Sequence, residues 1–275
     1  MATPSAIRIY IVRHGETDAN RLGILQGQMD TPLNANGVLQ AEQTAEALER
    51  VRFVGAYASD LQRAGKTAEI ILSKHPGVEL KRYEELRERS LGSLEGKKTT
   101  ELGRAELSDD VETSAVFAAR VIRWWNKIVV QRHAQQAQVR DTAAKATAEQ
   151  DTSQDKYEES IDTASGTSDT TKNESSRLSP QQPNTIPNIL VVSHGGAIGT
   201  LVIQLLGSRK LRCAEGVVVG RCINASISVV EVRASGNGVL LSYADTTHLE
   251  ETLELVEVNA DVVGDEDSDG APRAV

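Results

Sequence analysis

Two short motifs that pair a histidine with a glycine stand far apart in the chain. The tripeptide Arg13-His14-Gly15 follows the apolar residues 7–12, and the tripeptide His194-Gly195-Gly196 follows the apolar residues 189–193. An imidazole can act as a nucleophile, a glycine lets an anion approach the backbone, and a guanidinium binds phosphate in a planar, bidentate manner. One such motif is compatible with a structural histidine, but two of them predict phosphate chemistry.

Two charged residues between these motifs extend the candidate site. Arg63 comes shortly after the apolar residues 53–59, where we expect the first turn of a helix and where a helix end and a guanidinium both favour phosphate. Glu88 lies among basic residues in a predicted loop, and loops frequently carry functional groups. Each residue alone would be an ordinary solvated charge. Together with the histidine motifs they indicate a site for a phosphomonoester, whose charge of about −1.5 to −2 at neutral pH must be offset.

The elements that would position these residues alternate between strands and helices. Runs rich in β-branched residues predict strands at 7–12, 53–59, 189–193, 225–232 and 239–243, and helical spacing predicts helices at 37–51, 61–71, 113–131 and 197–206. This alternation predicts an α/β fold, a three-layer α/β/α sandwich with a mostly parallel sheet. Ligands of such sheets bind at the carboxyl ends of the strands, which is where His14, Arg63 and His194 fall.

Two local predictions concern helices. Asp60 has the side chain of a helix N-cap, and we expect it to begin the helix that runs through Ile71. In the helix at 113–131, one side is expected to face the core through aliphatic residues, namely Val116, Ala119, Ile122 and Val129.

The composition is that of a globular protein with an acidic balance. The chain has 275 residues, 39% of them hydrophobic, and a formal net charge of −9. This charge disfavours nucleic acid or an anionic membrane as a partner, because both require a basic surface. The N-terminus lacks the pattern of a signal peptide, and no apolar run is long enough to cross a bilayer. We expect a cytoplasmic protein, with access to the nucleus left open, whose partner is a small phosphorylated metabolite.

Metal and disulfide patterns are not evident in the sequence. Two cysteines, Cys213 and Cys222, are too few for a disulfide framework. Cysteine, histidine and aspartate do not cluster with the spacing of metal ligands. Neither a metal nor a cofactor is therefore expected.

Two segments differ from the rest of the chain in composition. Residues 135–187 consist mostly of Gln, Thr, Ser, Asp, Glu and Ala, and residues 259–275 are acidic. Such segments bury too little apolar surface to offset their ordering entropy. We therefore expect a single discontinuous domain, formed by 1–134 and 188–258, with a disordered polar insertion and a disordered acidic tail.

The four motifs, in this order, resemble the histidine phosphatase superfamily, also called the phosphoglycerate-mutase-like family. The resemblance covers residues 7–93 and 188–249. It implies that His14 is the phosphorylated nucleophile, that Arg13, Arg63 and His194 form the phosphate pocket, and that Glu88 is the proton donor. It also implies a set of substrate-side positions: Asn20, Gln26, Gly27 and Gly195.

This resemblance implies a metal-independent phosphatase that hydrolyses a phosphomonoester through a phosphohistidine intermediate on His14. The polar residues 97–110 are shorter than the covering segment of cofactor-dependent mutases, so we expect an open site, which favours hydrolysis. Three alternatives stay open: a cofactor-dependent phosphoglycerate mutase, a protein phosphatase, and a non-catalytic binding module with a phosphatase fold.

Further details are similar to the TIGAR-like fructose-2,6-bisphosphatases, which implies a sugar phosphate or bisphosphate as substrate. They are Leu25-Gln26-Gly27, Leu86-Arg87-Glu88-Arg89 and Asn224-Ala225-Ser226-Ile227-Ser228. Four basic residues are expected either to bind a second phosphate or to be solvated loop charges: Arg87, Arg89, Lys97 and Lys98. The sequence does not decide between these two roles.

Overall fold

The structure, a computed structural model, describes residues 6–101, 108–129, 131–132 and 186–249. The predictions made for residues 259–275, and for all but the last two residues of 135–187, lie outside the described residues. Among the described residues, no helix has both the length and the hydropathy that crossing a membrane requires.

A seven-stranded sheet forms the centre of the molecule, with the order β3-β2-β4-β1-β6-β7-β5. Its strands are β1 (Ala6–Arg13), β2 (Phe53–Ser59), β3 (Leu80–Tyr83), β4 (Asn188–Ser193), β5 (Leu211–Cys213), β6 (Ile227–Arg233) and β7 (Gly238–Asp245). Only β6 runs against its neighbours; the other pairs in the sheet are parallel. The predicted α/β class with a mostly parallel sheet is confirmed.

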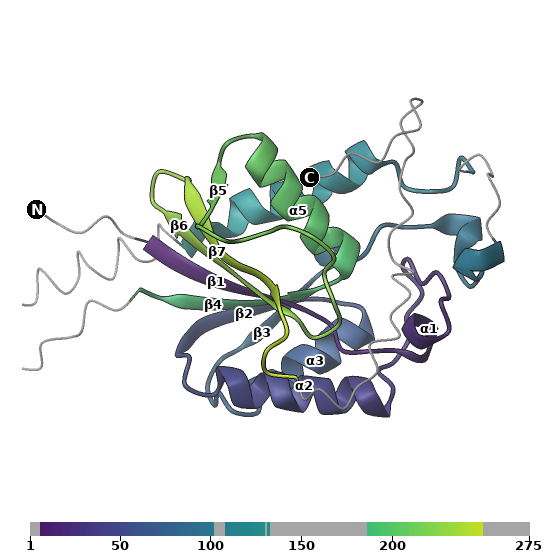
Figure 1. Cartoon of the computed structure of the whole chain (residues 1–275), viewed down its shortest axis with the longest axis horizontal. Coiled ribbons are helices and arrows are strands. Elements are labelled where there is room, and N and C mark those ends of the chain that lie inside the picture. Colours follow the sequence, from purple (N-terminus) through teal and green to yellow (C-terminus); the bar gives the residue numbers. More distant parts are fainter. Residues whose placement is uncertain (1–5, 102–107, 130, 133–185, 250–275) are drawn as a thin grey trace, which may run out of the picture.

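Helices cover both faces of this sheet (Figure 1). On one face lie α2 (Ala35–Leu48) and α3 (Gln62–Leu72), and on the other lie α5 (Gly195–Gly207) and a helix over residues 114–129. Each face has its own apolar cluster: one contains Trp124 and Leu201, the other contains Ala45 and Ala68. The result is a three-layer sandwich, as the alternation of strands and helices predicts.

The central strands β1 and β4 are buried on both faces, which explains their continuous apolar sequences. They pair in parallel with Arg13 opposite Ser193. Both strands therefore end at the same level, and the residue that follows each strand emerges at the same edge of the sheet.

Six short elements were not predicted from the sequence. They are the strands β3 and β5, the single-turn helix α1 (Asp18–Arg21) and the 3-10 helices η1 (Glu84–Leu86), η2 (Gly92–Leu94) and η3 (Thr99–Glu101). The helix α1 begins with a capping box, in which the Thr17 side chain and the Asn20 side chain each bond the other residue's backbone N–H. These elements are too short for hydrophobic periodicity to reveal them.

The prediction that Asp60 caps α3 is wrong. The N-cap residue is Leu61, and the carboxylate of Asp60 instead accepts two hydrogen bonds from the guanidinium of Arg87, at 2.8 and 2.5 Å. Asp30, from a distant loop, accepts the backbone N–H of Gln62 at 2.7 Å. A tertiary contact thus replaces the local cap.

The predicted core face of the helix at 113–131 is also wrong in part. Val116 is 56% exposed and Ala119 is exposed, whereas Val129 is buried as expected. The buried side is instead dominated by larger residues, namely Phe117, Val121, Trp124, Trp125 and Ile128. Aromatic side chains bury more area than alanine or valine, so they set the orientation of the helix.

Candidate active site

The two histidine motifs meet at the carboxyl ends of β1 and β4. His14 directly follows β1, and its backbone N–H donates to Ser193 O at 2.9 Å. His194 directly follows β4 and is the N-cap residue of α5. The centroids of the two imidazole rings are 5.1 Å apart. Parallel pairing of two neighbouring strands therefore brings together residues separated by 180 positions in the sequence.

The hydrogen bonding of His14 defines which ring nitrogen is free to react. Its Nδ1 lies 2.7 Å from the carbonyl oxygen of Gly15. Because a carbonyl oxygen only accepts, Nδ1 carries the hydrogen of the neutral ring, and Nε2 keeps its lone pair. Nε2 is buried and has no hydrogen-bond partner among the described residues. The same holds for both ring nitrogens of His194.

Both imidazoles are held in the neutral form. Burial lowers the pKa of His14 well below its usual range, and the positive charges of Arg63 and Arg13 lower it further. The pKa of His194 is lowered well below its usual range by burial and then by Arg63, among other groups. A neutral ring with an unpaired Nε2 is the form of histidine that can act as a nucleophile.

Two buried guanidinium groups lie at the same edge of the sheet. Arg63, in the first turn of α3, donates from Nη1 to Met29 O at 2.7 Å and from Nη2 to Gly27 O at 2.9 Å. Arg13, the last residue of β1, donates from Nη1 to Cys222 O at 2.6 Å. These carbonyl oxygens hold both groups in place, at positions from which their positive charges act on the two imidazoles.

Glu88 is fully buried at the start of α5. Its carboxylate accepts the backbone N–H of Gly196 at 2.8 Å and that of Arg89, also at 2.8 Å. A Cβ atom at Gly196 would lie 2.4 Å from a carboxylate oxygen of Glu88. At Gly195 it would lie 3.2 Å from Nε of Arg13. The two glycines are therefore required because charged side chains pack directly against the helix start.

Arg120, which the sequence did not single out, fixes the segment that carries Glu88. Its guanidinium donates to the backbone carbonyls of Glu85, Arg87 and Glu88 at 3.0, 3.0 and 3.2 Å. It also forms an ion pair with Glu112 at 2.7 Å. The segment around Glu88 thus has no regular secondary structure of its own but is held by the helix at 114–129.

The predicted substrate-side residues have different environments. Asn20 is buried, and among the described residues its side-chain nitrogen has no hydrogen-bond partner, which leaves a donor for a ligand. Gln26 uses its side-chain oxygen to accept from Thr17 and Thr31. Gly27 has a φ of +49° and accepts from Arg63. Asn20 is therefore suited to contact substrate, whereas Gln26 and Gly27 shape the loop that holds Arg63.

The expectation of an open site rests on residues 97–110, of which 102–107 lie outside the described residues; the side chains of the site itself are buried. Arg13 is 1% exposed, and His14, Arg63, Glu88 and His194 are completely inaccessible to solvent. The groups therefore act in surroundings of low polarity, where each charge and hydrogen bond has a larger effect than in water.

The four basic residues considered for a second phosphate fall into two groups. Arg87 is bound to Asp60, and its positive charge lowers the pKa of that carboxyl. Arg89 donates from Nε to Glu112 O at 2.6 Å. Lys97 and Lys98 are exposed. The two arginines therefore serve the local structure, and the two lysines are exposed charges.

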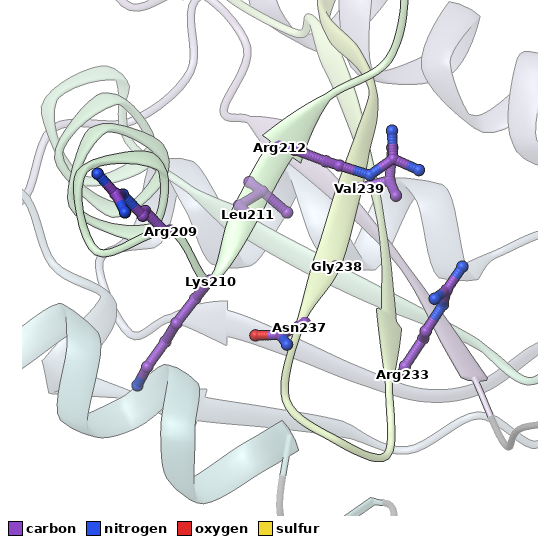
Figure 2. A pocket seen from close by; sticks show the side chains of 8 residues that line it. All are labelled: Arg209, Lys210, Leu211, Arg212, Arg233, Asn237, Gly238 and Val239. Atoms are coloured by element: carbon purple, nitrogen blue, oxygen red, sulfur yellow. The ribbon is translucent and has the colours of Figure 1, made fainter.

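A pocket of about 210 Å³ lies elsewhere, between the start of β5 and the start of β7 (Figure 2). The pairings of Gly238 with Val232 and of Val232 with Ile7 place it at the amino end of β1. That end is about 23 Å from His14, at about 3.3 Å per residue. Its basic side chains point in different directions in Figure 2: Arg209, Lys210, Arg212 and Arg233. This pocket is separate from the histidine cluster.

Two further residues that sequence reasoning missed support the cluster. Asn224 donates from its side-chain nitrogen to His14 O at 2.9 Å. Thr67 accepts the backbone N–H of Gly15 at 3.1 Å and donates to Arg63 O at 2.8 Å. The motif containing Asn224 was noted only as a resemblance, and Thr67 gives no signal because threonine is common in helices and loops.

The site contains histidine and glutamate but no assembled set of metal ligands. Within the described part of the chain, no group of three or more His, Cys, Asp or Glu side chains is placed to hold a metal ion. The positive charge that acts on the two imidazoles, and lowers their pKa values, comes from Arg13 and Arg63.

Comparison with protein families gives a match over residues 9–139 to the histidine phosphatase superfamily, branch 1. This region contains Arg13, His14, Arg63 and Glu88, while His194 lies beyond it.

Several relatives share part or most of the chain. A probable phosphatase of Schizosaccharomyces pombe is 25% identical over 91% of this chain and 100% of its own length. The metal-independent phosphoserine phosphatase of Arabidopsis thaliana is 29% identical over 88% of this chain and 82% of its own. Fructose-2,6-bisphosphatase TIGAR B of Danio rerio is 44% identical, but only over 32% of this chain and 36% of its own length.

Solved structures confirm the fold. The phosphoglycerate mutase of Bacillus anthracis superposes with a TM-score of 0.58 and 21% identity, over 89% of this chain and 96% of its own. The alpha-ribazole phosphatase of Shigella flexneri gives 0.58 and 20%, over 87% and 96%. At these identities the likeness shows the fold alone, and it is equally strong for a mutase and a phosphatase.

Proposed function

We propose that the chain, whose residues 9–139 match the histidine phosphatase superfamily, is a member of it that hydrolyses a phosphomonoester, a sugar phosphate or bisphosphate, through a phosphohistidine intermediate on His14 and without a metal ion. The observation that carries the proposal is the state of His14: a neutral imidazole whose Nδ1 is bound to Gly15 O and whose buried Nε2 has no partner among the described residues. The names of the full-length relatives, a probable phosphatase and a metal-independent phosphoserine phosphatase, support an enzyme of the phosphatase class.

In the first step, the lone pair of His14 Nε2 forms a bond to phosphorus as the bond to the ester oxygen breaks on the opposite side. The departing alkoxide takes a proton from Glu88, so an alcohol leaves and Glu88 becomes a carboxylate. Glu88 suits this role because it is buried at the start of α5, the helix whose N-cap residue is His194.

Positive charge stabilises the phosphoryl group during this transfer. Arg13 and Arg63 are already fixed by backbone carbonyls and so need no reorganisation when charge develops. His194 offers a ring N–H from a position 5.1 Å from His14, measured between ring centroids. Fixed donors in a water-poor site supply the stabilisation that a metal ion supplies in other phosphatases.

In the second step, water attacks the phosphohistidine. Glu88, now a carboxylate, accepts a proton from this water, the P–N bond breaks, and inorganic phosphate is released with the ring electrons returned to Nε2. The cycle restores neutral His14 and protonated Glu88. Asn20, with its unpaired side-chain nitrogen, is placed to donate to a phosphoryl or substrate oxygen.

Whether the enzyme acts as a phosphatase or as a mutase depends on whether the phosphohistidine intermediate is exposed to water for long enough to be hydrolysed. The full-length relatives with phosphatase names favour hydrolysis. A panel of sugar monophosphates, sugar bisphosphates and phosphopeptides, together with 3-phosphoglycerate supplied with bisphosphoglycerate, separates the candidate activities.

The direct test is phosphate release from p-nitrophenyl phosphate by the full chain, with and without EDTA. We expect turnover that EDTA does not change and an acid-labile phosphoryl group trapped on the wild-type protein. His14→Asn should remove both, with a rate loss on the order of 10⁴-fold or more, as when the nucleophile of a comparable covalent mechanism is removed. Activity of His14→Asn near the wild-type level, or loss on chelation that a divalent cation restores, would exclude the mechanism.

A further inference from the structure

A turn formed by residues 222–226 clamps the end of β1, where Arg13 and His14 lie. The backbone N–H of Ala225 donates to Arg13 O at 3.1 Å and to His14 O at 3.2 Å. The side chain of Asn224 donates to His14 O at 2.9 Å, and Cys222 O accepts from Arg13 at 2.6 Å. The position of both residues therefore depends on the conformation of this turn.

The turn contains a residue with an unfavourable backbone. Ala225 has a φ of +57° and is fully buried. The left-handed region costs a residue with a Cβ atom roughly 1–2 kcal/mol. Such a conformation persists only where surrounding contacts fix it. The backbone N–H of Ala225 bonds the end of β1, and its carbonyl oxygen is a second point at which such contacts act.

His248 makes one of these contacts. Its Nε2 is 3.1 Å from Ala225 O and 3.1 Å from Oγ1 of Thr44, in α2. The Thr44 hydroxyl lies 2.8 Å from Gln40 O and 3.4 Å from Ala225 O; it donates its hydrogen to the nearer carbonyl, so its oxygen accepts from His248. Both partners of Nε2 are acceptors, which assigns the hydrogen of the ring to Nε2. His248 therefore donates to the turn and to α2 at the same time.

The chain after β7 is directed toward this contact by its own backbone. Ala244 has a φ of +48°, its N–H donates to Ser228 Oγ at 2.9 Å, and the pairing of β6 with β7 shifts register near this end. The chain then turns at Thr246–Leu249, closed by a hydrogen bond of 2.9 Å between Leu249 N and Thr246 O. A bulge and a turn thus place a histidine that follows the last strand against α2.

We propose that His248 is a positioning residue for catalysis: by donating to Ala225 O, it holds the turn that fixes Arg13 and His14. It acts through the turn and does not touch the reacting atoms. This inference rests on the proposed function for its effect on turnover, but its effect on the ring of His14 can be measured without any turnover.

The test compares two substitutions, one that keeps a hydrogen-bond donor near Ala225 O and one that removes it. In His248→Gln the amide nitrogen lies close to the place of Nε2 and can still donate to Ala225 O, whereas His248→Leu has no donor. For p-nitrophenyl phosphate we expect His248→Leu to lower kcat about tenfold to a hundredfold, the range in which a small misplacement of reacting groups reduces a rate. KM should change much less, and His248→Gln should stay within about threefold of the wild type.

A second measurement separates positioning from stability. ¹⁵N NMR of the histidine rings should show the Nδ1–H tautomer of His14 in the wild type and in His248→Gln, and a mixture of tautomers in His248→Leu. His75→Gln is the matched control, because His75 is also buried but packs against Phe53, away from the site. It should change neither kcat nor the His14 tautomer.

Three results would overturn the proposal: His248→Leu with wild-type kcat, His248→Gln no better than His248→Leu, or an unchanged His14 tautomer in His248→Leu. Should His248→Leu fail to fold, His248→Asn provides the same contrast, since its shorter amide does not reach Ala225 O. If the wild type releases no phosphate from any ester, the proposed function fails, and the NMR measurement alone decides the role of His248.

Discussion

Both ends of the central sheet carry clustered positive charge, but only one end has the features of a phosphate site. At the carboxyl end of β1, Arg13 and Arg63 are buried, and backbone carbonyls hold them in place. At the amino end, four basic side chains surround the pocket at the start of β5 and β7: Arg209, Lys210, Arg212 and Arg233. All four are exposed, and none forms an ion pair with an acidic side chain of the described residues.

The difference shows that fixed geometry, and not the number of cations, makes an anion site. An exposed guanidinium is screened by salt and must lose side-chain entropy to bind. A buried one that backbone groups already orient has lost that entropy during folding. Of the basic residues at the amino end, Arg212 lies in β5, a short edge strand, and charge on an edge strand disfavours pairing with another chain.

Among the tests of this comparison between the two ends of the sheet, the largest effect should come from removing one buried guanidinium. Arg63→Gln should lower kcat/KM for p-nitrophenyl phosphate about 10²–10³-fold, comparable to the loss of one preorganised charge-stabilising donor in other enzymes. Arg233→Gln is the matched control at the other end of the sheet and should change kcat/KM less than about twofold. Similar losses in the two variants, measured at the same ionic strength, would mean that long-range charge and not fixed geometry carries the effect.

A smaller effect should appear in the pH dependence of stability. The pKa values of His14 and His194 are lowered in the folded state, and in the unfolded chain they return to about 6.5. The unfolded state therefore binds more protons below that pH, so stability is full above about pH 6.5 and falls as the pH decreases. We expect the Tm to drop by about 5 °C or more between pH 7 and pH 5.

The double variant His14→Asn/His194→Asn isolates this contribution. His75 and His248 also have lowered pKa values and remain in the variant, so its Tm should still fall with pH, but less steeply. Scanning calorimetry at matched ionic strength compares the two slopes. If Tm falls equally steeply with pH in the wild type and in the double variant, His14 and His194 do not contribute to the pH dependence of stability.

The smallest effect should follow from deleting residues 135–187 and closing the gap with a short Gly/Ser linker. The chain enters β4 at Asn188, which pairs with Arg8 at the end of β1 that lies away from His14. Loop-closure entropy changes slowly with loop length, so the Tm should stay within a few degrees and kcat within about twofold. An unchanged Tm with a large loss of kcat would instead mean that this segment contributes to catalysis at the site around His14.

The main features of the fold and of the site could be predicted from the sequence because they depend on local patterns. Apolar runs that end in His-Gly gave the positions of His14 and His194. Residues whose partners are distant could not be predicted: Asp60 bonds Arg87 instead of capping α3, and His248 contacts Thr44 in α2. Such contacts are set by which elements become neighbours, and a single sequence does not display this.

The burial of the site residues is a further instance of this limit. Arg63 and Glu88, each taken alone, would be ordinary solvated charges, yet both are buried in the structure. Arg120, from the helix at 114–129, holds the segment of Glu88 through three backbone carbonyls. Packing of this kind has no signature in residue spacing.

The place of β1 in the sheet also has a consequence for biosynthesis. Its two neighbours in the sheet are β4 and β6. Arg8 pairs with Asn188 on one side and with Glu231 on the other, and both residues are synthesised much later. At about 5–20 residues per second, the first partner emerges roughly 10–40 s after β1 has been made. During that interval an apolar strand has both edges unpaired, which is the form most prone to aggregation. His14 is thus made among the first residues, but the strand that carries it can pair only after β4 and then β6 have been translated.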